Sequence, residues 1–516
     1  MTARQGSAQR MVEATLAVFV LSALVKVIAL GRDLALAAYF GAGPATDAYM
    51  VATVIPFHLW LPAAGIVVLA FVPVFSSQLA TDGRRRAWKT FSGVLSLLTV
   101  TAALAALAGF VWAPRLVAAM APGLDPPTLA LAASLARVML PAMVGFSLYA
   151  VVAAALNAHG RFAVAAGAPV LLNLAMVAAI LLFASRYGIV AVGVGCVVGA
   201  GLQSVFCLPS LLAVKAAYSW RVGFADPGLR KVGRLLWPLA AALLLGQASV
   251  LVERYLASWL AVGSISALAY ATKVAGLPQM LVATAVATVV FPSLARYASR
   301  NEDDRFRRTL AQALRVSLLV LVPAAVGLVI LGQPVVRMLL QRGAFDVRAT
   351  QLTASALVFY APGMVAAGAA GILVRGSYAV QDMISPLGVA ALALVAHVAA
   401  AFSLVGPMGH AGLAIATSLG SWVHFLALYV LLRTRGLLTP LSLREWVRPA
   451  MAVAGMAVVT LAVVGLTGGG LAGTAAAIGA GSTVYLAGLV RLGVPEARDA
   501  LAMARAGLRE RLGVRR

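Results

Sequence analysis

The chain has 516 residues, of which 62% are hydrophobic and only 11% are charged, and its mean hydropathy is +0.97. This composition excludes a soluble protein, because too few charged residues remain to cover an apolar core. The net charge of +24 does not indicate nucleic-acid binding, since the cations cluster between apolar stretches, where an anionic membrane leaflet attracts them. We therefore predict an all-α polytopic membrane protein.

Apolar runs of about 20 residues predict about fourteen transmembrane helices. The second run is long, and Pro56, Pro62 and Pro73 interrupt it, which requires surrounding protein or a water-filled cavity at that depth. The predicted spans are 11–31, 44–78, 88–112, 128–156, 162–184, 188–214, 235–261, 265–294, 309–332, 350–377, 386–405, 409–432, 449–467 and 470–492.

Cations occupy every second gap between the predicted spans. By the positive-inside rule these gaps face the cytoplasm, which places both termini there and makes the number of spans even. The segment 495–516 alternates apolar and basic faces and is expected to be an amphipathic cytoplasmic tail. The cation-rich gaps are Arg84–Lys89, Lys215–Arg234, Arg296–Arg308 and Arg433–Arg448.

The two halves of the chain resemble each other. Gly188 leads to Gln203 over the same interval that separates Gly409 from His424. This favours a parallel repeat, with two six-helix lobes related by a pseudo-two-fold axis along the membrane normal. The alternative is that helices rich in Gly, Ala and Val resemble each other by composition alone. The predicted divisions are an N-lobe at 11–216, a C-lobe at 230–434, spans thirteen and fourteen at 449–492, and the tail.

Ionisable residues within the first two spans are candidates for function, because charge at membrane depth is costly. Lys26 lies in the middle of the first span, Arg32 and Asp33 follow it, and Asp47 begins the second span, where it can neutralise one of these cations. We interpret them as the lining of a polar cavity. An internal ion pair or an interface anchor is the alternative.

The second half offers Glu253, Arg254, Lys273 and His397. Neighbouring residues on a helix point about 100° apart, so Glu253 and Arg254 are each expected to have a partner on another helix. Glu253 is a candidate cation or proton site, with a static salt bridge as the alternative. Lys273 is expected to face a cavity, and a histidine such as His397 can titrate or serve as a packing residue.

No Walker loop, metal-ligand cluster or catalytic triad occurs in the sequence, and its two cysteines lie too far apart along one helix to bridge. We expect no cofactor and no metal. Uphill transport would therefore draw on sodium, protons or the membrane potential.

Several blocks resemble the MurJ (MviN) family of lipid II flippases, within the multidrug/oligosaccharidyl-lipid/polysaccharide exporter superfamily. They begin with Gly-Arg-Asp at 31–33 and Pro-Ala-Thr-Asp-Ala-Tyr at 44–49. Further similar segments are Ile55-Pro56, Phe71–Phe75, Glu253–Ser258, Gly263–Ala271, Arg375–Asp382 and Gly409–Leu419.

The resemblance implies fourteen helices in two lobes around a cationic cavity, with a lateral groove for a lipid tail near the last two spans. It also implies a bacterial inner-membrane transporter rather than an enzyme. Arg32 and Asp47 match the family's motif in type. Lys26 and Lys273 stand where the family has arginine, and His397 stands where many relatives have asparagine. Lysine cannot form the two parallel hydrogen bonds that arginine makes to a phosphate, so the head group or its coordination is expected to differ from that of the family.

In two further places the chain departs from the family. The run after Pro56, at 57–62, lacks the family's cations, and Gly276 replaces an acidic residue. We predict substrate binding by Lys26, Arg32, Asp47 and Lys273, and take Glu253 and His397 as candidates for ion coupling.

The predicted function is translocation of an undecaprenyl-diphosphate-linked sugar, similar to the peptidoglycan precursor lipid II, from the cytoplasmic to the outer leaflet by alternating access. The alternatives are a flippase for lipid-linked exopolysaccharide repeat units and a cation-coupled small-molecule exporter, which a cavity lined by lysine and arginine disfavours. Expected partners are the lipid-linked glycan, membrane lipids and cell-wall synthesis proteins, and no nucleic acid.

Overall fold

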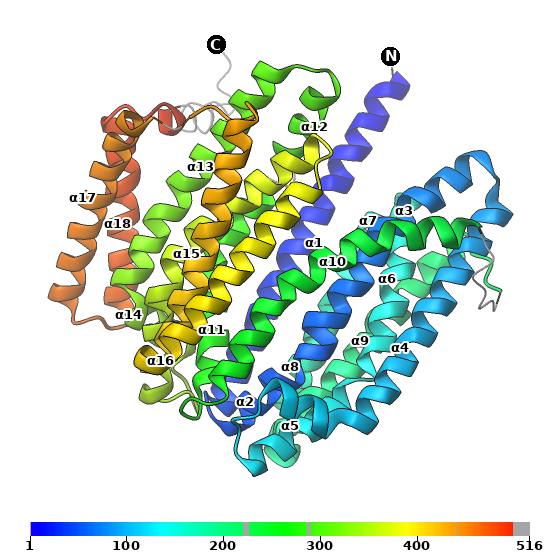
Figure 1. The fold of residues 1–516 in the computed structure, drawn as a ribbon, viewed down its shortest axis with the longest axis horizontal. Coiled ribbons are helices and arrows are strands. Elements are labelled where there is room, and N and C mark those ends of the chain that lie inside the picture. Colours follow the sequence, from blue (N-terminus) through cyan, green and yellow to red (C-terminus); the bar gives the residue numbers. More distant parts are fainter. Residues whose placement is uncertain (1, 220–226, 286–289, 441, 499–516) are drawn as a thin grey trace. The chain divides into compact units, whose positions relative to one another are not determined.

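The computed structural model describes residues 2–219, 227–285, 290–440 and 442–498, and these residues are almost entirely helical (Figure 1). Among these residues, each predicted span falls mostly on helix. Within the described residues, ten helical segments are long and apolar enough to cross a membrane. The all-helical membrane fold is therefore confirmed, whereas the count of about fourteen stays a prediction.

The helices divide into two compact units, which we call unit 1 and unit 2. Unit 1 runs to Ser266 and includes Arg342–Asp346, and unit 2 contains Ala267–Gln341 and the chain from Val347 onward. The helix α10 (Pro227–Ala257) belongs to unit 1 because it packs against α3 and α4. This grouping rests on packing and does not test the predicted repeat of 11–216 and 230–434 or the separate spans at 449–492.

The other helices of unit 1 are α1 (Thr2–Phe40), α2 (Pro44–Ala52), the π-helix η1 (Val54–Trp60), α3 (Leu61–Thr81), α4 (Arg84–Met120), α5 (Pro126–Met139), α6 (Ala142–Ala158), α7 (Phe162–Gly167), α8 (Pro169–Tyr187) and α9 (Val190–Ala213). Helix α11 (Ser264–Ala285) begins in unit 1 and continues in unit 2. The other helices of unit 2 are α12 (Phe291–Ser299), α13 (Asp303–Ile330), α14 (Gly332–Leu340), α15 (Val347–Ala379), α16 (Ile384–Thr434), α17 (Leu443–Thr467) and α18 (Leu471–Arg491).

The second span is interrupted, as its prolines predict. The α2 helix gives way to the π-helix η1, in which the backbone N–H of Leu61 donates to the carbonyl of Pro56, before α3 begins. The indole N–H of Trp60 donates to the hydroxyl of Ser147 at 2.9 Å. The wide turn thus continues the helix past a proline that has no N–H of its own to donate.

Small residues set the distance between helices in unit 1. A Cβ atom at Gly199 on α9 would lie 2.8 Å from the Cα of Leu172 on α8, and one at Gly145 on α6 would lie 2.7 Å from the backbone of Ala200. These approaches leave no room for a side chain. Van der Waals contact at small residues is the usual basis of helix association in membranes, where lipid supplies little hydrophobic driving force.

Within α16 the predicted spans 386–405 and 409–432 are two helical arms that meet at a kink, as predicted. Inside α16, Gly409 has φ +56° and divides the helix into two arms, Ile384–Met408 and His410–Thr434. The second arm packs on α15, where the hydroxyl of Ser418 donates to the carbonyl of Phe359 at 2.5 Å. The positive φ explains why glycine occupies the bend.

A hairpin of α17 and α18 is fixed to α13 by polar contacts. The Arg315 guanidinium on α13 lies 2.5 Å from a carboxylate oxygen of Glu445 and 2.6 Å from one of Glu496. The Tyr485 hydroxyl on α18 donates to the carbonyl of Leu319 at 2.6 Å. One arginine therefore joins α13 to the start of α17 and to the segment after α18. Of the predicted tail at 495–516, only 495–498 are described, and they begin a helix.

We expect Arg315→Gln to loosen the hairpin, because Glu496, only 16% exposed, would lose its cationic partner. Charge-assisted hydrogen bonds of this kind contribute about 1–3 kcal/mol each. Thermal unfolding in detergent and protease cleavage between α16 and α17 would measure the loss. The exposed Arg444→Gln is the matched control, and equal behaviour of the two variants would contradict the assigned role of Arg315.

Candidate functional site

Arg32 is a partly buried cation near the end of α1. Its side chain is 17% exposed, and its Nε and Nη2 atoms lie 3.2 Å and 2.9 Å from the same carboxylate oxygen of Asp33. Its Nη1 faces the sulfur of Met176 on α8 at 3.9 Å, and thioether sulfur is a weak acceptor. Two of the five guanidinium N–H groups therefore lie outside these contacts, available to an anion.

Lys26 differs from Arg32 in its surroundings. It lies on the same helix but is exposed in the structure. A lysine side chain is long enough to place its ammonium group several ångströms from its own Cα. The structure therefore does not bring Lys26 into the buried pair that Arg32 makes with Asp33.

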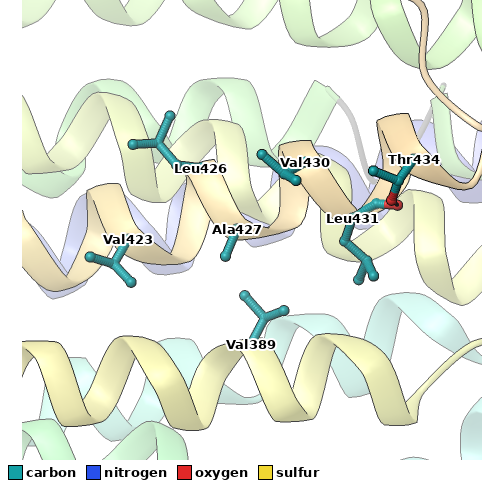
Figure 2. Close-up of a pocket in the computed structure, with 7 residues that line it drawn as sticks. All are labelled: Val389, Val423, Leu426, Ala427, Val430, Leu431 and Thr434. Atoms are coloured by element: carbon teal, nitrogen blue, oxygen red, sulfur yellow. Dashed lines mark hydrogen bonds between the residues drawn. The ribbon is translucent and has the colours of Figure 1, made fainter.

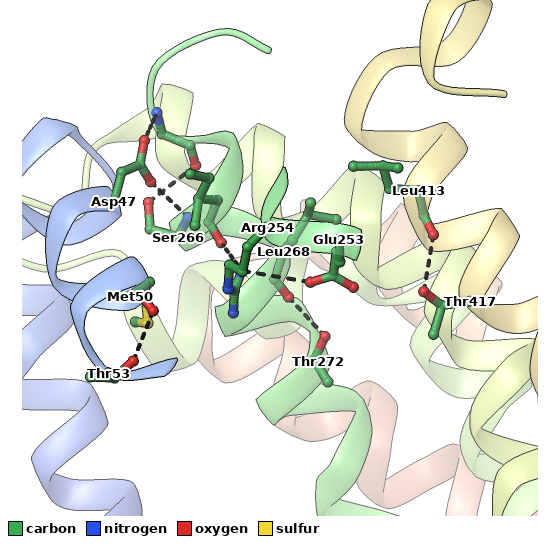
Figure 3. A network of polar contacts seen from close by, with 12 residues as sticks. Asp47, Met50, Thr53, Glu253, Arg254, Ser266, Leu268, Thr272, Leu413 and Thr417 are labelled. Atoms are coloured by element: carbon green, nitrogen blue, oxygen red, sulfur yellow. Dashed lines mark hydrogen bonds and ion pairs between the residues drawn. The ribbon is translucent and has the colours of Figure 1, made fainter. Parts of the chain in front are cut away.

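Asp47 is almost fully buried, at 2% exposed, and it holds the start of α11 (Figure 3). Its two carboxylate oxygens accept from the backbone N–H of Gly263 at 2.6 Å and of Ser266 at 2.8 Å. The first N–H groups of a helix have no partner within the helix, and Gly263 has no side chain with which to cap them. A carboxylate that is distant in sequence therefore serves as the N-cap.

The cation that interacts with Asp47 is not one of the two that the sequence predicted. We expected Asp47 to neutralise Lys26 or Arg32, but it interacts electrostatically with Arg254, whose guanidinium also donates to the carbonyl of Ile265 at 3.0 Å. Arg254 thus supports the same turn that Asp47 caps. The predicted role of Asp47 in substrate binding stays a prediction beside this structural role.

The expectation that Glu253 and Arg254 cannot pair with each other is wrong. The Nη1 of Arg254 lies 3.6 Å from a carboxylate oxygen of Glu253, and both side chains are largely buried. Although their Cβ atoms diverge, the long guanidinium side chain folds back along the helix, as it also does in the Arg32–Asp33 pair. Arg32 and Arg254 therefore each have a carboxylate on the adjacent residue.

The remaining predicted residues lie in unit 2. The ammonium nitrogen of Lys273 on α11 lies 5.6 Å from the centre of the Tyr270 ring, a cation–π distance. His397, on the first arm of α16, is 4% exposed and packs against Gly420 of the second arm, where an added Cβ would lie 2.9 Å from its own Cβ. This is the environment of a packing histidine. No group of three or more His, Cys, Asp or Glu side chains among the described residues could hold a metal ion.

Gly263, Ile265 and Ser266 are the contributors to this polar network that the sequence did not single out. They act through their backbone atoms, which residue types do not reveal. One feature of the sequence could have pointed to them. The helix that starts at Gly263-Ser-Ile-Ser has no acidic residue in its first turn, so its first backbone N–H groups need acceptors from another part of the chain.

Comparison with known proteins places this arrangement in a family. Residues 36–480 match the family described as "Lipid II flippase MurJ". The lipid II flippase MurJ of Burkholderia cenocepacia is 31% identical over 444 residues, which cover 84% of this chain and 85% of the relative. The probable lipid II flippase MurJ of Rhizobium meliloti is 32% identical over 422 residues, covering 78% and 77% respectively.

Solved structures share the fold. A lipid II flippase MurJ in an inward closed conformation superposes with a TM-score of 0.79 at 23% identity, covering 95% of this chain and all of the other. An inward-facing MATE family multidrug resistance transporter of the MOP superfamily gives 0.70 at 15% identity, covering 80% and 94%. Helical transporters of this architecture are thus the structural neighbours of the chain.

We predict that Asp47→Ala destabilises the protein by about 1–3 kcal/mol, because two backbone N–H groups would lose a charged acceptor. Asp47→Asn should fall between Ala and the wild type, since its amide can accept through one oxygen only. Thermal unfolding in detergent would measure both. Asp304→Ala, at a carboxylate that is 85% exposed, is the control. An Asp47→Ala protein as stable as wild type would refute the capping role and leave the substrate role as the reason for any lost activity.

Proposed function

The chain belongs to the MurJ family of lipid II flippases, and on that premise we propose that it moves a lipid-linked sugar diphosphate, the peptidoglycan precursor lipid II or a close analogue, across the membrane. The match of residues 36–480 to that family carries the proposal. The relatives that align over most of their length are named lipid II flippases or probable ones. The protein would then be a transporter and not an enzyme.

The residues of α1 suit a diphosphate head group. Phosphate oxygens prefer guanidinium donors in paired geometry, and Arg32 has two N–H groups outside its contacts with Asp33 and Met176. The bound phosphate would share the guanidinium with Asp33 or displace that carboxylate. Lys26 would contribute a point charge on the same helix as Arg32. Lys273 on α11 is a separate candidate for substrate binding.

The direction of transport follows from orientation. The cation-rich segments between spans would face the cytoplasm, with both termini, in the inner membrane of a bacterium. The head group would enter from the cytoplasmic leaflet and leave on the outer one by alternating access, while the polyprenyl chain remains in lipid. Cell-wall synthesis proteins would supply or consume the substrate.

Coupling would draw on sodium, protons or the membrane potential, with Glu253 and His397 as the candidate groups. Glu253 is supported by its near-complete burial beside Arg254, since a carboxylate at membrane depth is a frequent proton or cation carrier. His397 is less well suited, because its surroundings are those of a packing residue.

Lipid-linked exopolysaccharide repeat units are a second candidate substrate. The observation that favours them is the set of departures from the family's pattern, Lys273 and Gly276 on α11 and the cation-free run at 57–62. A small-molecule exporter gains support only from the shared fold of the MATE transporters, which carries no substrate information.

Complementation of cells depleted of their own lipid II flippase would test the proposal, with exposure of lipid II on the outer leaflet as the readout. We expect rescue by the wild type and its loss with Arg32→Gln, because a phosphate-binding guanidinium would be missing. A correctly inserted wild-type protein that exposes no lipid II would overturn the peptidoglycan substrate. Restored capsule in a strain lacking its polysaccharide flippase would then support the second candidate.

The pair with Asp33 needs its own control, because Arg32→Gln also leaves a buried carboxylate without its partner. The double variant Arg32→Gln, Asp33→Asn removes both charges, so neither side chain is left with an uncompensated charge. If Arg32 binds phosphate, the double variant stays inactive. If Arg32 serves only to neutralise Asp33, the double variant regains transport and the binding role is lost.

A further inference from the structure

An apolar groove runs along α16, between its two arms. Its volume is about 560 Å³, and Figure 2 shows Val389 on the first arm facing a row of side chains on the second. Within that row Leu426 is 50% exposed and Val430 is 57% exposed. The lining residues are Val389, Val423, Leu426, Ala427, Val430, Leu431 and Thr434. The groove thus offers an open, hydrocarbon-like surface.

Two arginines lie at one end of this groove. Thr434 is its last lining residue and lies between the exposed Arg433 and Arg435. Arg433 follows Leu426 by seven residues and Val430 by three, spacings that place it on the same helix face as the groove. Its guanidinium can therefore reach a group held where the apolar lining ends.

Arg435 is already engaged by the other arm. It forms an ion pair with Asp382 and donates to the Ser385 hydroxyl at 2.8 Å. Although partial burial acts to raise it, the pKa of Asp382 lies below its usual range, because Ser385 and Arg435 donate hydrogen bonds to the carboxylate. The pair thus persists at neutral pH and joins the two arms at the charged end of the groove.

A third arginine adds a donor without a partner. The Nη2 of Arg307 on α13 lies 3.9 Å from the position of a Cβ atom at Gly436, just after Arg435. Its Nε is buried and has no hydrogen-bond partner among the described residues. Unsatisfied buried donors are uncommon. The donor that an anion near Gly436 would meet is Nη2, whereas Nη1 lies 4.0 Å from a carboxylate oxygen of Asp304.

We propose that this groove and the arginines at its end form a binding site for a resident anionic phospholipid, one acyl chain lying in the groove and the phosphate between Arg433 and Arg307. A chain gains little by leaving other lipid tails for an apolar groove, so selectivity must come from charge at the end of the groove. The site lies within unit 2 alone, and it is independent of the proposed transport substrate.

Native mass spectrometry would test the site, after the purified protein is mixed with equal amounts of phosphatidylglycerol and phosphatidylethanolamine of identical chains. We expect the wild type to retain phosphatidylglycerol preferentially, and Arg433→Gln combined with Arg307→Gln to reduce that preference at least threefold. Ala427→Trp should lower the retention of phosphatidylglycerol by filling the groove.

Matched controls lie within unit 2, outside the groove. Arg348→Gln removes an exposed charge at the opposite end of α15, and Val395→Trp places the same ring on an exposed part of the first arm, away from Val389. Equal retention of the two lipids by the wild type would overturn the proposal, as would unchanged preference in the variants. Displacement of bound phosphatidylglycerol by undecaprenyl diphosphate would also overturn the proposal, because the groove would then bind the transported lipid.

Discussion

The fold depends on one constraint: buried backbone polar groups at helix starts and helix breaks must find partners within the protein. Asp47 meets this constraint for α11, because its buried carboxylate accepts from the N–H groups of Gly263 and Ser266. The two partners lie 216 and 219 residues away from it in sequence. The geometry of the second span therefore determines where α11 begins, and the break at Pro56 is satisfied in turn by the widened turn of η1.

Two buried arginines share a second feature, a carboxylate on the adjacent residue. Arg32 pairs with Asp33, and Arg254 with Glu253. Pairing lowers the cost of burying each cation, because an isolated charge in a low-dielectric environment is far more expensive than a pair. The same pairing tempers the attraction of Arg32 for an anion, so a diphosphate would bind by exchange of hydrogen bonds and not by bare charge attraction.

Hydropathy was sufficient to predict where the described residues are helical, but the sequence did not reveal how the helices are joined. Spans 386–405 and 409–432 are two helical arms, as predicted, and the non-helical backbone of Gly409 separates them. The partners of Asp47 were unpredictable, because they are backbone groups of distant residues. The pairing of Glu253 with Arg254 was predicted wrongly, because a rule based on Cβ directions ignores the reach of a guanidinium.

The α17–α18 hairpin bears on where a lipid chain can lie. A Cβ atom at Gly488 would lie 3.1 Å from the Cβ of Ala452, so the two helices touch there and leave no space between them. Arg315 fixes the hairpin to α13, while its outer face carries exposed apolar side chains such as Val458 and Leu486. A lipid tail near these helices would therefore lie along their outer surface, in contact with the bilayer. A polyprenyl chain could then stay in the membrane while only its polar head group needs a path through protein.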